Sequence, residues 1–219
     1  MVVGEADANG VSDGRVREAL GELTGEIEIV PPMHSAVWHE GRRLYEIARE
    51  GETVEVQSRA VTVHSFELLG FEPGPRARAL TEVACSSGTY VRSLAAMLGA
   101  ALGCPAFLSF LVRTRVGTQR VEDSLTGREL TQAIRDGRLD ELLRAPEDML
   151  AGWPRIEADR ETAAALCRGM RIDAPSMLTP GQRVLAMAGG RLLCVAEVVA
   201  DGERALIQPR RVLLSEDEV

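Results

Sequence analysis

Hydrophobic and polar residues alternate with two different periods along this chain of 219 residues. An apolar residue every three to four positions, the spacing of an amphipathic helix, recurs at residues 13–25, 42–50, 90–102, 124–150 and 159–167. Strict alternation, the spacing of a strand, occurs at residues 54–56, 61–68, 76–84, 106–116, 183–187, 192–199 and 205–208. The pattern predicts an α+β fold: a mixed or antiparallel sheet with flanking helices, followed by a small β-rich module.

Glycine and proline mark the boundaries between these segments. Residues 4–14 are rich in Gly, Asp and Asn and lack an apolar period, so we expect a mobile lead-in. Gly152-Trp153-Pro154 is the clearest internal boundary. The sequence therefore predicts two domains, residues 1–150 and residues 154–219, of which the second is small and gains stability by docking on its neighbour.

The charge of the chain limits how it could bind nucleic acid. The formal net charge is −8, and every one of the 25 basic residues is arginine. A global positive field is excluded, so any RNA contact must come from a local patch. Without lysine, Schiff-base chemistry and a phosphate-loop lysine are also excluded. Arginine remains well suited to bidentate phosphate contacts and to stacking on bases.

The cysteines, the histidines and the apolar runs limit which classes of protein remain. The four cysteines form no Cys-x-x-Cys pair and the three histidines form no ligand motif, so the sequence indicates neither a zinc site nor a disulfide scaffold and gives little support to a metalloenzyme. The thiols are typical of a reduced, cytoplasmic protein. No apolar run is long enough to span a bilayer, and nothing in the sequence indicates more than a monomer.

The most informative stretch is Cys-Ser-Ser-Gly-Thr-Tyr-Val-Arg, residues 85–92, between a predicted strand and a predicted helix. A junction of this kind can hold a planar ring and a cationic fork, those of Tyr90 and Arg92, at the mouth of a cleft. Each residue also has a plainer interpretation. Tyr90 could cap the core with its hydroxyl in water, and Arg92 could be a solvated helix residue.

That octet resembles the TruB family of tRNA pseudouridine synthases, together with two further stretches. These are Pro-Pro-Met-His-Ser-Ala at residues 31–36 and Gly-Arg-Arg-Leu-Tyr-Glu-Ile-Ala-Arg-Glu-Gly at residues 41–51, and the resemblance runs from about Val16 to the C-terminus. It implies a pseudouridine synthase catalytic domain and a PUA-like RNA-binding domain. It also implies isomerisation of a T-loop uridine, with the T-arm of tRNA as the partner and no cofactor.

The resemblance implies roles for three residues. Tyr90 matches the tyrosine that stacks against the flipped base and is a candidate proton acceptor. Arg92 matches the arginine that pairs with the nucleophilic aspartate. Leu111 matches the apolar residue on the other side of the base, although by itself it would be an ordinary core leucine.

The same resemblance implies RNA contacts by several arginines, two of them in the C-terminal module. They are Arg42, Arg43, Arg49, Arg113 and Arg115, and in the C-terminal module Arg210 and Arg211. The alternative for each is an ordinary charged surface, and Arg49 could pair with Glu46 or Glu52. Two positions depart from the family pattern: His34 replaces an aromatic residue and Trp38 replaces a lysine.

The nucleophilic aspartate of the family lies in Gly-x-Leu-Asp-Pro-x-Ala-Thr-Gly, which this sequence does not contain. We therefore expect the 219 residues by themselves to lack turnover, and three explanations stay open. The start could be assigned at an internal methionine of a complete enzyme, which we rank first. The chain could be truncated. It could also be a non-catalytic protein that binds tRNA or assists RNA folding.

Overall fold

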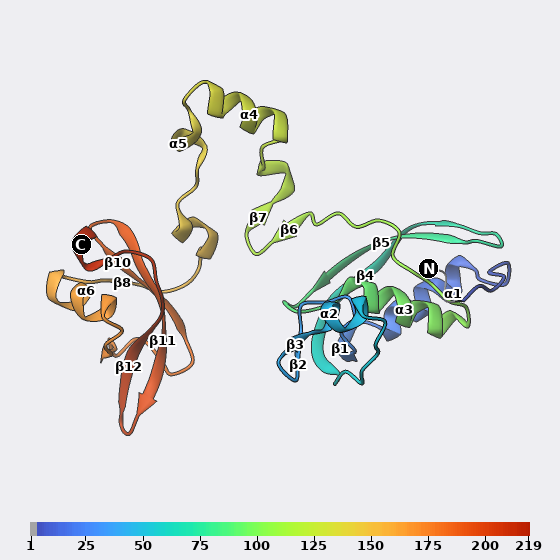
Figure 1. The fold of residues 1–219 in the computed structure, drawn as a ribbon, viewed down its shortest axis with the longest axis horizontal. Helices are drawn as coiled ribbons and strands as arrows, with labels where there is room; N and C mark the ends of the chain where they lie inside the picture. The colour runs from blue at the N-terminus through green and yellow to red at the C-terminus, as the bar shows by residue number, and fades with distance from the viewer. Residues whose placement is uncertain (1–3) are drawn as a thin grey trace. The chain divides into compact units, whose positions relative to one another are not determined.

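The structure, a computed structural model, describes residues 4–219, and the chain divides into two compact units. The first extends to Leu111 and the second begins at Val112. Each unit has its own sheet and its own buried side chains (Figure 1). The domain boundary that the sequence predicts at residues 150–154 differs from this division by compactness and stays a prediction.

The first unit is built on a three-stranded antiparallel sheet in the order β1-β4-β5. Its strands are β1 (Gly25–Ile29), β4 (Arg59–Glu72) and β5 (Arg78–Cys85). The long central strand pairs with both neighbours, so that Val63 faces Gly25 on one side and Cys85 on the other. The turn at residues 73–77 joins β4 to β5 where Pro-Gly-Pro predicted it.

Helices α1 (Asp13–Glu22) and α3 (Val91–Leu102) supply the apolar partners of this sheet. Leu94 and Leu98 lie one turn apart on α3 and are buried against strand residues, as the helical spacing predicted. The predicted mobile lead-in was wrong in part. Ala8 and Val11 are buried in the same cluster as α1, because two small apolar side chains suffice to anchor a polar segment.

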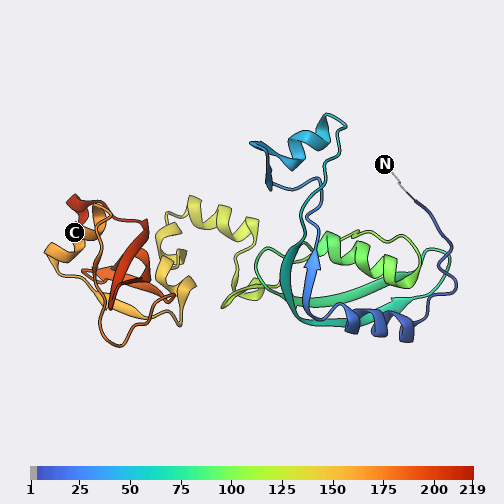
Figure 2. The same cartoon turned by 90° about the horizontal axis from the view of Figure 1, so that it is seen from below.

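Between β1 and β4 the chain forms an excursion that we call the α2 lobe, residues 31–58. It contains the short strands β2 (Trp38–His39) and β3 (Arg42–Arg43) and the helix α2 (Leu44–Arg49). Figure 2 shows it standing off the sheet of the first unit. Leu44 and Ile47 are buried, so the lobe has a small apolar interior. The strand predicted at residues 54–56 is irregular chain instead.

The strand predicted over residues 106–116 was wrong for most of its length. Residues 105–114 form no regular element, and only β6 (Arg115–Val116) pairs, with β7 (Gln119–Arg120). The segment is extended and apolar, and the side chain of Phe107 is 84% exposed. Alternation of apolar residues gives a strand its propensity, but a strand also needs a hydrogen-bonding neighbour, and the described residues provide none here.

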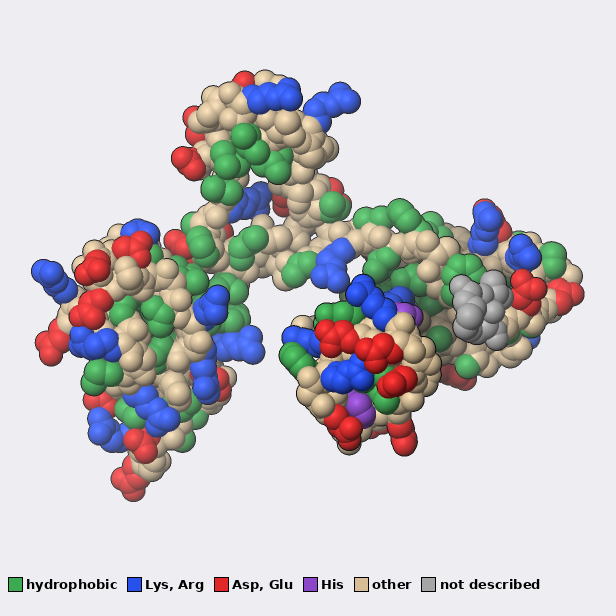
Figure 3. Space-filling view, in the orientation of Figure 1, with side chains coloured by type: hydrophobic (Ala, Val, Ile, Leu, Met, Phe, Trp, Pro, Cys, Tyr) green, Lys and Arg blue, Asp and Glu red, His purple; other side chains and the backbone are tan. Residues whose placement is uncertain are grey.

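Helical segments occupy the first part of the second unit. They are η1 (Val121–Asp123), α4 (Gly127–Arg135), α5 (Leu139–Leu142) and η2 (Pro146–Leu150). Thr126 caps α4 and exchanges hydrogen bonds with Glu129, the reciprocal arrangement of a capping box. The apolar side predicted for this region is exposed: Ile134 is 55% and Leu143 is 65% accessible. Figure 3 shows hydrophobic side chains gathered on this helical part of the second unit.

The rest of the second unit is a five-stranded sheet in the order β8-β10-β11-β12-β9. Its elements are β8 (Arg155–Glu157), α6 (Arg160–Cys167), β9 (Ile172–Asp173), β10 (Arg183–Ala188), β11 (Arg191–Asp201), β12 (Arg204–Val212) and η3 (Glu216–Glu218). Asp159 caps α6 by accepting a hydrogen bond from the amide of Thr162 at 2.8 Å, and the helix was predicted. Leu166 of α6 packs into the buried cluster with Leu193 and Ile207.

The α+β class, with helices on an antiparallel sheet and a β-rich C-terminal part, is therefore confirmed. One close approach decides how the chain leaves α3. A Cβ atom at Gly99 would lie 2.6 Å from the amide nitrogen of Ala106, so only glycine allows the helix and the following segment to touch.

Candidate active site

The turn between β5 and α3 is held by hydroxyl groups. The Ser86 hydroxyl accepts a hydrogen bond from the amide of Thr62 at 3.0 Å, and the Ser86 amide donates to the Thr62 carbonyl at 2.8 Å. The Thr89 hydroxyl donates back to the Ser86 carbonyl at 2.9 Å. Gly88 has a φ of +87°, in the left-handed region that favours glycine. These contacts fix the direction in which Tyr90 and Arg92 leave the sheet.

Tyr90 is the N-cap residue, directly before α3. Its backbone is extended, with φ −94° and ψ 103°, and its carbonyl accepts the first hydrogen bonds of the helix from Ser93 and Leu94. The side chain is half-buried and packs against the cluster that contains Ile29 and Val61. The side chain is thus in contact with the core, while part of it stays accessible.

Arg92 lies in the first turn of α3 and is exposed. Its Nη2 atom donates a hydrogen bond to the carbonyl oxygen of His34 at 2.9 Å, across 58 positions of sequence. The structure therefore brings together the stretches 31–36 and 85–92. The guanidinium contacts a neutral carbonyl here, so its positive charge is not paired with a carboxylate in this contact.

Leu111 lies at the end of the first unit, outside any strand, and its side chain is 53% exposed. It is not among the residues packed around the cluster of Tyr90. The described structure therefore does not bring Leu111 together with Tyr90 and Arg92, and its role stays a prediction.

The three arginines of the α2 lobe are each held by neighbours. Arg42 forms an ion pair with Glu50 at 2.6 Å, and this hydrogen bond raises the pKa of the arginine. The guanidinium of Arg43 lies 4.0 Å above the ring of Trp38, and that of Arg49 lies 5.3 Å from the ring of Tyr45.

Because of these contacts, the three arginines do not form a simple basic patch. Figure 3 shows acidic and basic side chains mixed on the lobe. An RNA phosphate would have to compete with Glu50 for Arg42. Arg49, for which the sequence offered pairing with Glu46 or Glu52 as the alternative to an RNA contact, lies instead near the ring of Tyr45, and the Trp38 departure places an aromatic ring beneath Arg43.

The remaining predicted arginines belong to the second unit. Arg113 is in irregular chain, and Arg115 pairs with Arg120 across the β6-β7 hairpin. Arg210 and Arg211 lie on β12, and Arg210 donates to Glu197 at 3.0 Å. All four are exposed, and their part in RNA binding stays a prediction.

Sequence reasoning missed several residues that shape this region. Ser86 and Thr89 build the turn, and Ser93 donates its hydroxyl hydrogen to the carbonyl of Val30 at 2.7 Å. Ser and Thr at turns are a known local signal and could have indicated the first two. The partner of Ser93 lies 63 residues away, so no local pattern could have found it.

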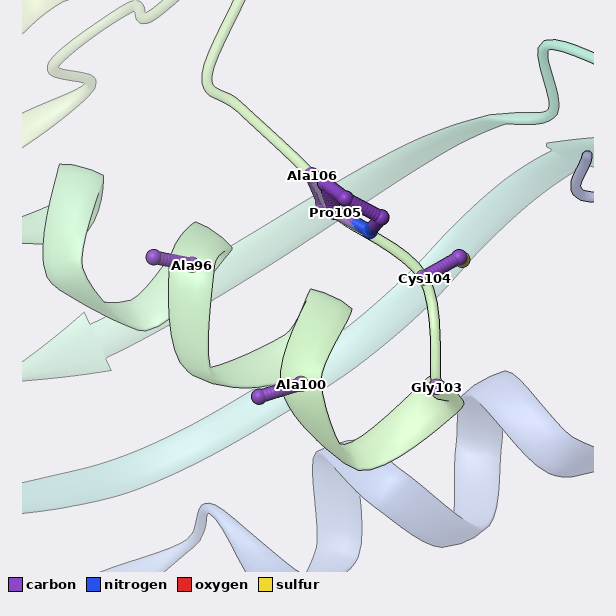
Figure 4. A pocket seen from close by; sticks show the side chains of 6 residues that line it. All are labelled: Ala96, Ala100, Gly103, Cys104, Pro105 and Ala106. Carbon is purple, nitrogen blue, oxygen red and sulfur yellow. The ribbon is translucent and has the colours of Figure 1, made fainter. Parts of the chain in front are cut away.

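A shallow hollow elsewhere on α3 is apolar rather than reactive. It is lined by Ala96 and Ala100 on the helix and by residues 103–106 of the segment that follows (Figure 4). Among the described residues, no three His, Cys, Asp or Glu side chains gather in a way that could hold a metal ion. None of the helices within residues 4–219 is long and apolar enough to cross a membrane.

The architecture corresponds to that of known solved structures. A chain in the crystal structure of a Cbf5-Nop10-Gar1 complex superimposes with a TM-score of 0.71 over 97% of this chain and 65% of its own, at 21% identity. A chain in the structure of an H/ACA ribonucleoprotein bound to a substrate RNA containing 2'-deoxyuridine gives a TM-score of 0.66. At this identity the likeness shows the fold alone, an α+β arrangement that is shared over nearly the whole chain.

Sequence similarity then identifies the family. The family described as TruB family pseudouridylate synthase (N terminal domain) matches residues 1–91. The tRNA pseudouridine synthase B of Pelotomaculum thermopropionicum is 36% identical over 97% of this chain and 71% of its own length. That of Aromatoleum aromaticum is 43% identical over 93% of this chain and 63% of its own. The chain belongs to the TruB family, which confirms the resemblance, and it spans about two thirds of the length of these relatives.

Proposed function

We propose that this chain serves in the isomerisation of uridine to pseudouridine in tRNA, at a uridine of the T-loop. The single observation that supports the proposal best is the start of α3, where a half-buried Tyr90 and an exposed Arg92 meet the 31–36 stretch. The membership of the TruB family and the names of its relatives support the reaction class. A protein that acts on tRNA would work in the cytoplasm. We also expect it to act as a monomer.

For this reaction the protein must supply a stacking surface for the base, a proton acceptor and a carboxylate nucleophile. The bond between the base and the sugar breaks, the base turns, and it rejoins through carbon, after which the proton on that carbon must leave. The ring of Tyr90 offers a stacking surface for the extruded base, and its hydroxyl is the candidate proton acceptor. Arg92 would orient a carboxylate nucleophile and keep it ionised. Leu111 would cover the other side of the base.

The carboxylate is the part that the 219 residues do not supply in the family motif. The contact between Arg92 and a neutral carbonyl leaves the guanidinium able to accept a carboxylate with a gain in Coulomb energy. The 219-residue chain by itself should therefore bind tRNA without turnover. The same expectation describes the alternative, a non-catalytic tRNA-binding protein, so the two hypotheses need an experiment that restores the carboxylate.

The T-arm would be bound by arginines, all of them exposed except the half-buried Arg43. Arg42, Arg43 and Arg49 line the α2 lobe, and Arg113, Arg115, Arg210 and Arg211 lie on the second unit. Because the net charge is −8, binding depends on these local groups and should weaken steeply with salt.

The test is the release of tritium from tRNA whose uracil is labelled at the carbon that becomes bonded to the sugar in pseudouridine. The 219-residue chain should bind tRNA but release no tritium. A fusion that carries the segment of a TruB-family relative containing the Gly-x-Leu-Asp-Pro-x-Ala-Thr-Gly motif should release it. In that fusion Arg92→Ala should lower the rate by about 10²- to 10³-fold or more, since it removes a preorganised donor, while the loss of tRNA affinity should be far smaller.

Arg138→Ala is the matched control, because Arg138 is an exposed arginine on the second unit that is paired with Asp136. It should leave the rate of the fusion unchanged. Turnover by the 219-residue chain would contradict the account of the nucleophile. A folded fusion without turnover would favour the non-catalytic alternative.

A further inference from the structure

Two hydrogen bonds join the first turn of α3 to the entry of the α2 lobe. The Ser93 hydroxyl donates to the Val30 carbonyl at 2.7 Å, and Arg92 donates to the His34 carbonyl at 2.9 Å. Between the two bound carbonyls lie Pro31 and Pro32, whose rings restrict the backbone. Residues 30–34 therefore cross the start of α3 as a short, stiff strap attached near both ends.

The strap continues into the base of α2 without an unattached carbonyl from residue 34 to residue 37. The carbonyl of Ser35 accepts from the amide of Tyr45 at 3.1 Å, and that of Val37 accepts from the amide of Leu44 at 2.9 Å. The guanidinium of Arg43 donates to the carbonyl of Ala36. A displacement of α2 must therefore displace the strap, and with it the partner of Arg92.

A buried hydroxyl directly after the strap lacks a partner among the described residues. Ser35 is 6% exposed, and its Oγ atom has no hydrogen-bond partner among the described residues. A buried hydroxyl without a partner is unfavourable, so a rearrangement that provides one would be favoured. The unpaired hydroxyl of Ser35 therefore favours release of the strap, and the hydrogen bonds from Arg92 and Ser93 oppose it.

We propose that Ser93 is a positioning residue, the clasp that holds the α2 lobe in register with Tyr90 and Arg92. This rests on the proposed function, because it assigns the lobe and the start of α3 to one RNA substrate. The lobe carries three arginines and α3 carries the two site residues. A lobe fixed in register loses less conformational freedom when both parts bind the same RNA. Removing the clasp should therefore weaken binding without touching any RNA-contacting side chain.

The first arm of the test needs no RNA. The chain contains two tryptophans, Trp38 in the lobe and Trp153 in the second unit. In a Trp153→Phe background the fluorescence anisotropy of Trp38 reports the mobility of the lobe. Ser93→Ala should lower this anisotropy, and Ser93→Thr, which keeps a hydroxyl, should restore it. Ser124→Ala is the matched control, since Ser124 also donates to a carbonyl, that of Arg120, in the other unit.

The second arm measures tRNA affinity. Ser93→Ala should raise the Kd for tRNA by about 2- to 10-fold, the worth of one neutral hydrogen bond, and should lower the thermal midpoint slightly, because the free chain loses the same bond. Ser93→Thr and Ser124→Ala should bind like the unaltered chain. Unchanged Trp38 anisotropy in Ser93→Ala would overturn the clasp. If the unaltered chain binds no tRNA, the proposed function fails, and the anisotropy arm still decides whether the clasp exists.

Discussion

At the scale of single residues, the neighbours of a side chain decide what its chemistry can do. Arg42 and Arg92 are the same residue type, yet Arg42 is paired with Glu50 whereas Arg92 contacts a backbone carbonyl. The octet at residues 85–92 was sufficient to predict that Tyr90 and Arg92 lie at a strand-to-helix junction. It was not sufficient to predict the contact with His34, because a partner 58 positions away leaves no local pattern.

Cys194 provides a prediction at this scale. Its side chain is fully buried, and desolvation raises the pKa of its thiol to about 11. At pH 8 the reactive thiolate is then only about a thousandth of the population. In native protein treated with N-ethylmaleimide at pH 8, peptide mass spectrometry should find Cys194 unlabelled while the partly exposed Cys104 reacts. Both should react in guanidinium. Rapid native labelling of Cys194 would contradict its burial.

At the scale of elements, local signals predicted helices better than strands. Helices α3 and α6 follow directly from apolar spacing and from their boundaries, a left-handed Gly103 that ends α3 and an Asp159 cap that begins α6. Residues 106–112 have strand propensity but no neighbour to pair with in the described structure. Pairing is a non-local property, so alternation alone predicted a strand that does not form there.

The cap of α6 predicts a dependence on pH. Hydrogen bonds from Thr162, through its side chain and its backbone amide, lower the pKa of Asp159. A lowered folded-state pKa adds stability above the ordinary Asp value, and this stability is lost as the pH falls through the lowered pKa. Asp159→Ala should therefore lower the melting temperature at pH 7, and the difference should shrink in acid.

Asp159→Asn is the control for this prediction. Asparagine caps helices about as well as aspartate but does not ionise, so this variant should stay close to the unaltered chain at pH 7. Calorimetric melting temperatures at pH 7 and pH 3 would separate the effects. An Asp159→Ala deficit that is the same at both pH values would contradict a role for the ionised carboxylate.

At the scale of the whole molecule, two separate interiors organise the chain. The first unit is stabilised by the clusters around Leu20 and Leu94, and the second by those around Leu193 and Leu185. Composition and the Gly152-Trp153-Pro154 boundary were sufficient to predict a β-rich C-terminal part. They did not reveal that side chains before this boundary pack on its sheet, because such packing depends on which strand surface is left open.

A pair of fragments tests where the C-terminal domain begins. Leu150 and Trp153 pack against Leu185 and Met187, so a fragment of residues 154–219 would lose this cover. A fragment of residues 112–219 should fold, and that of residues 154–219 should be less stable by roughly 2–3 kcal/mol, from the apolar area exposed. Urea unfolding followed by circular dichroism would measure the difference. Equal midpoints would place the boundary after Trp153, as the sequence predicted.

The glycine at the crossing of α3 has a consequence for the route of the chain. Because Gly99 touches Ala106 without a side chain between them, the course of the polypeptide towards Leu111 depends on a hydrogen atom where other residues have a carbon. One added methyl group would push the two segments apart and alter that course. The location of Leu111, a predicted site residue, thus depends on Gly99, which lies twelve positions earlier and has the smallest side chain of any residue.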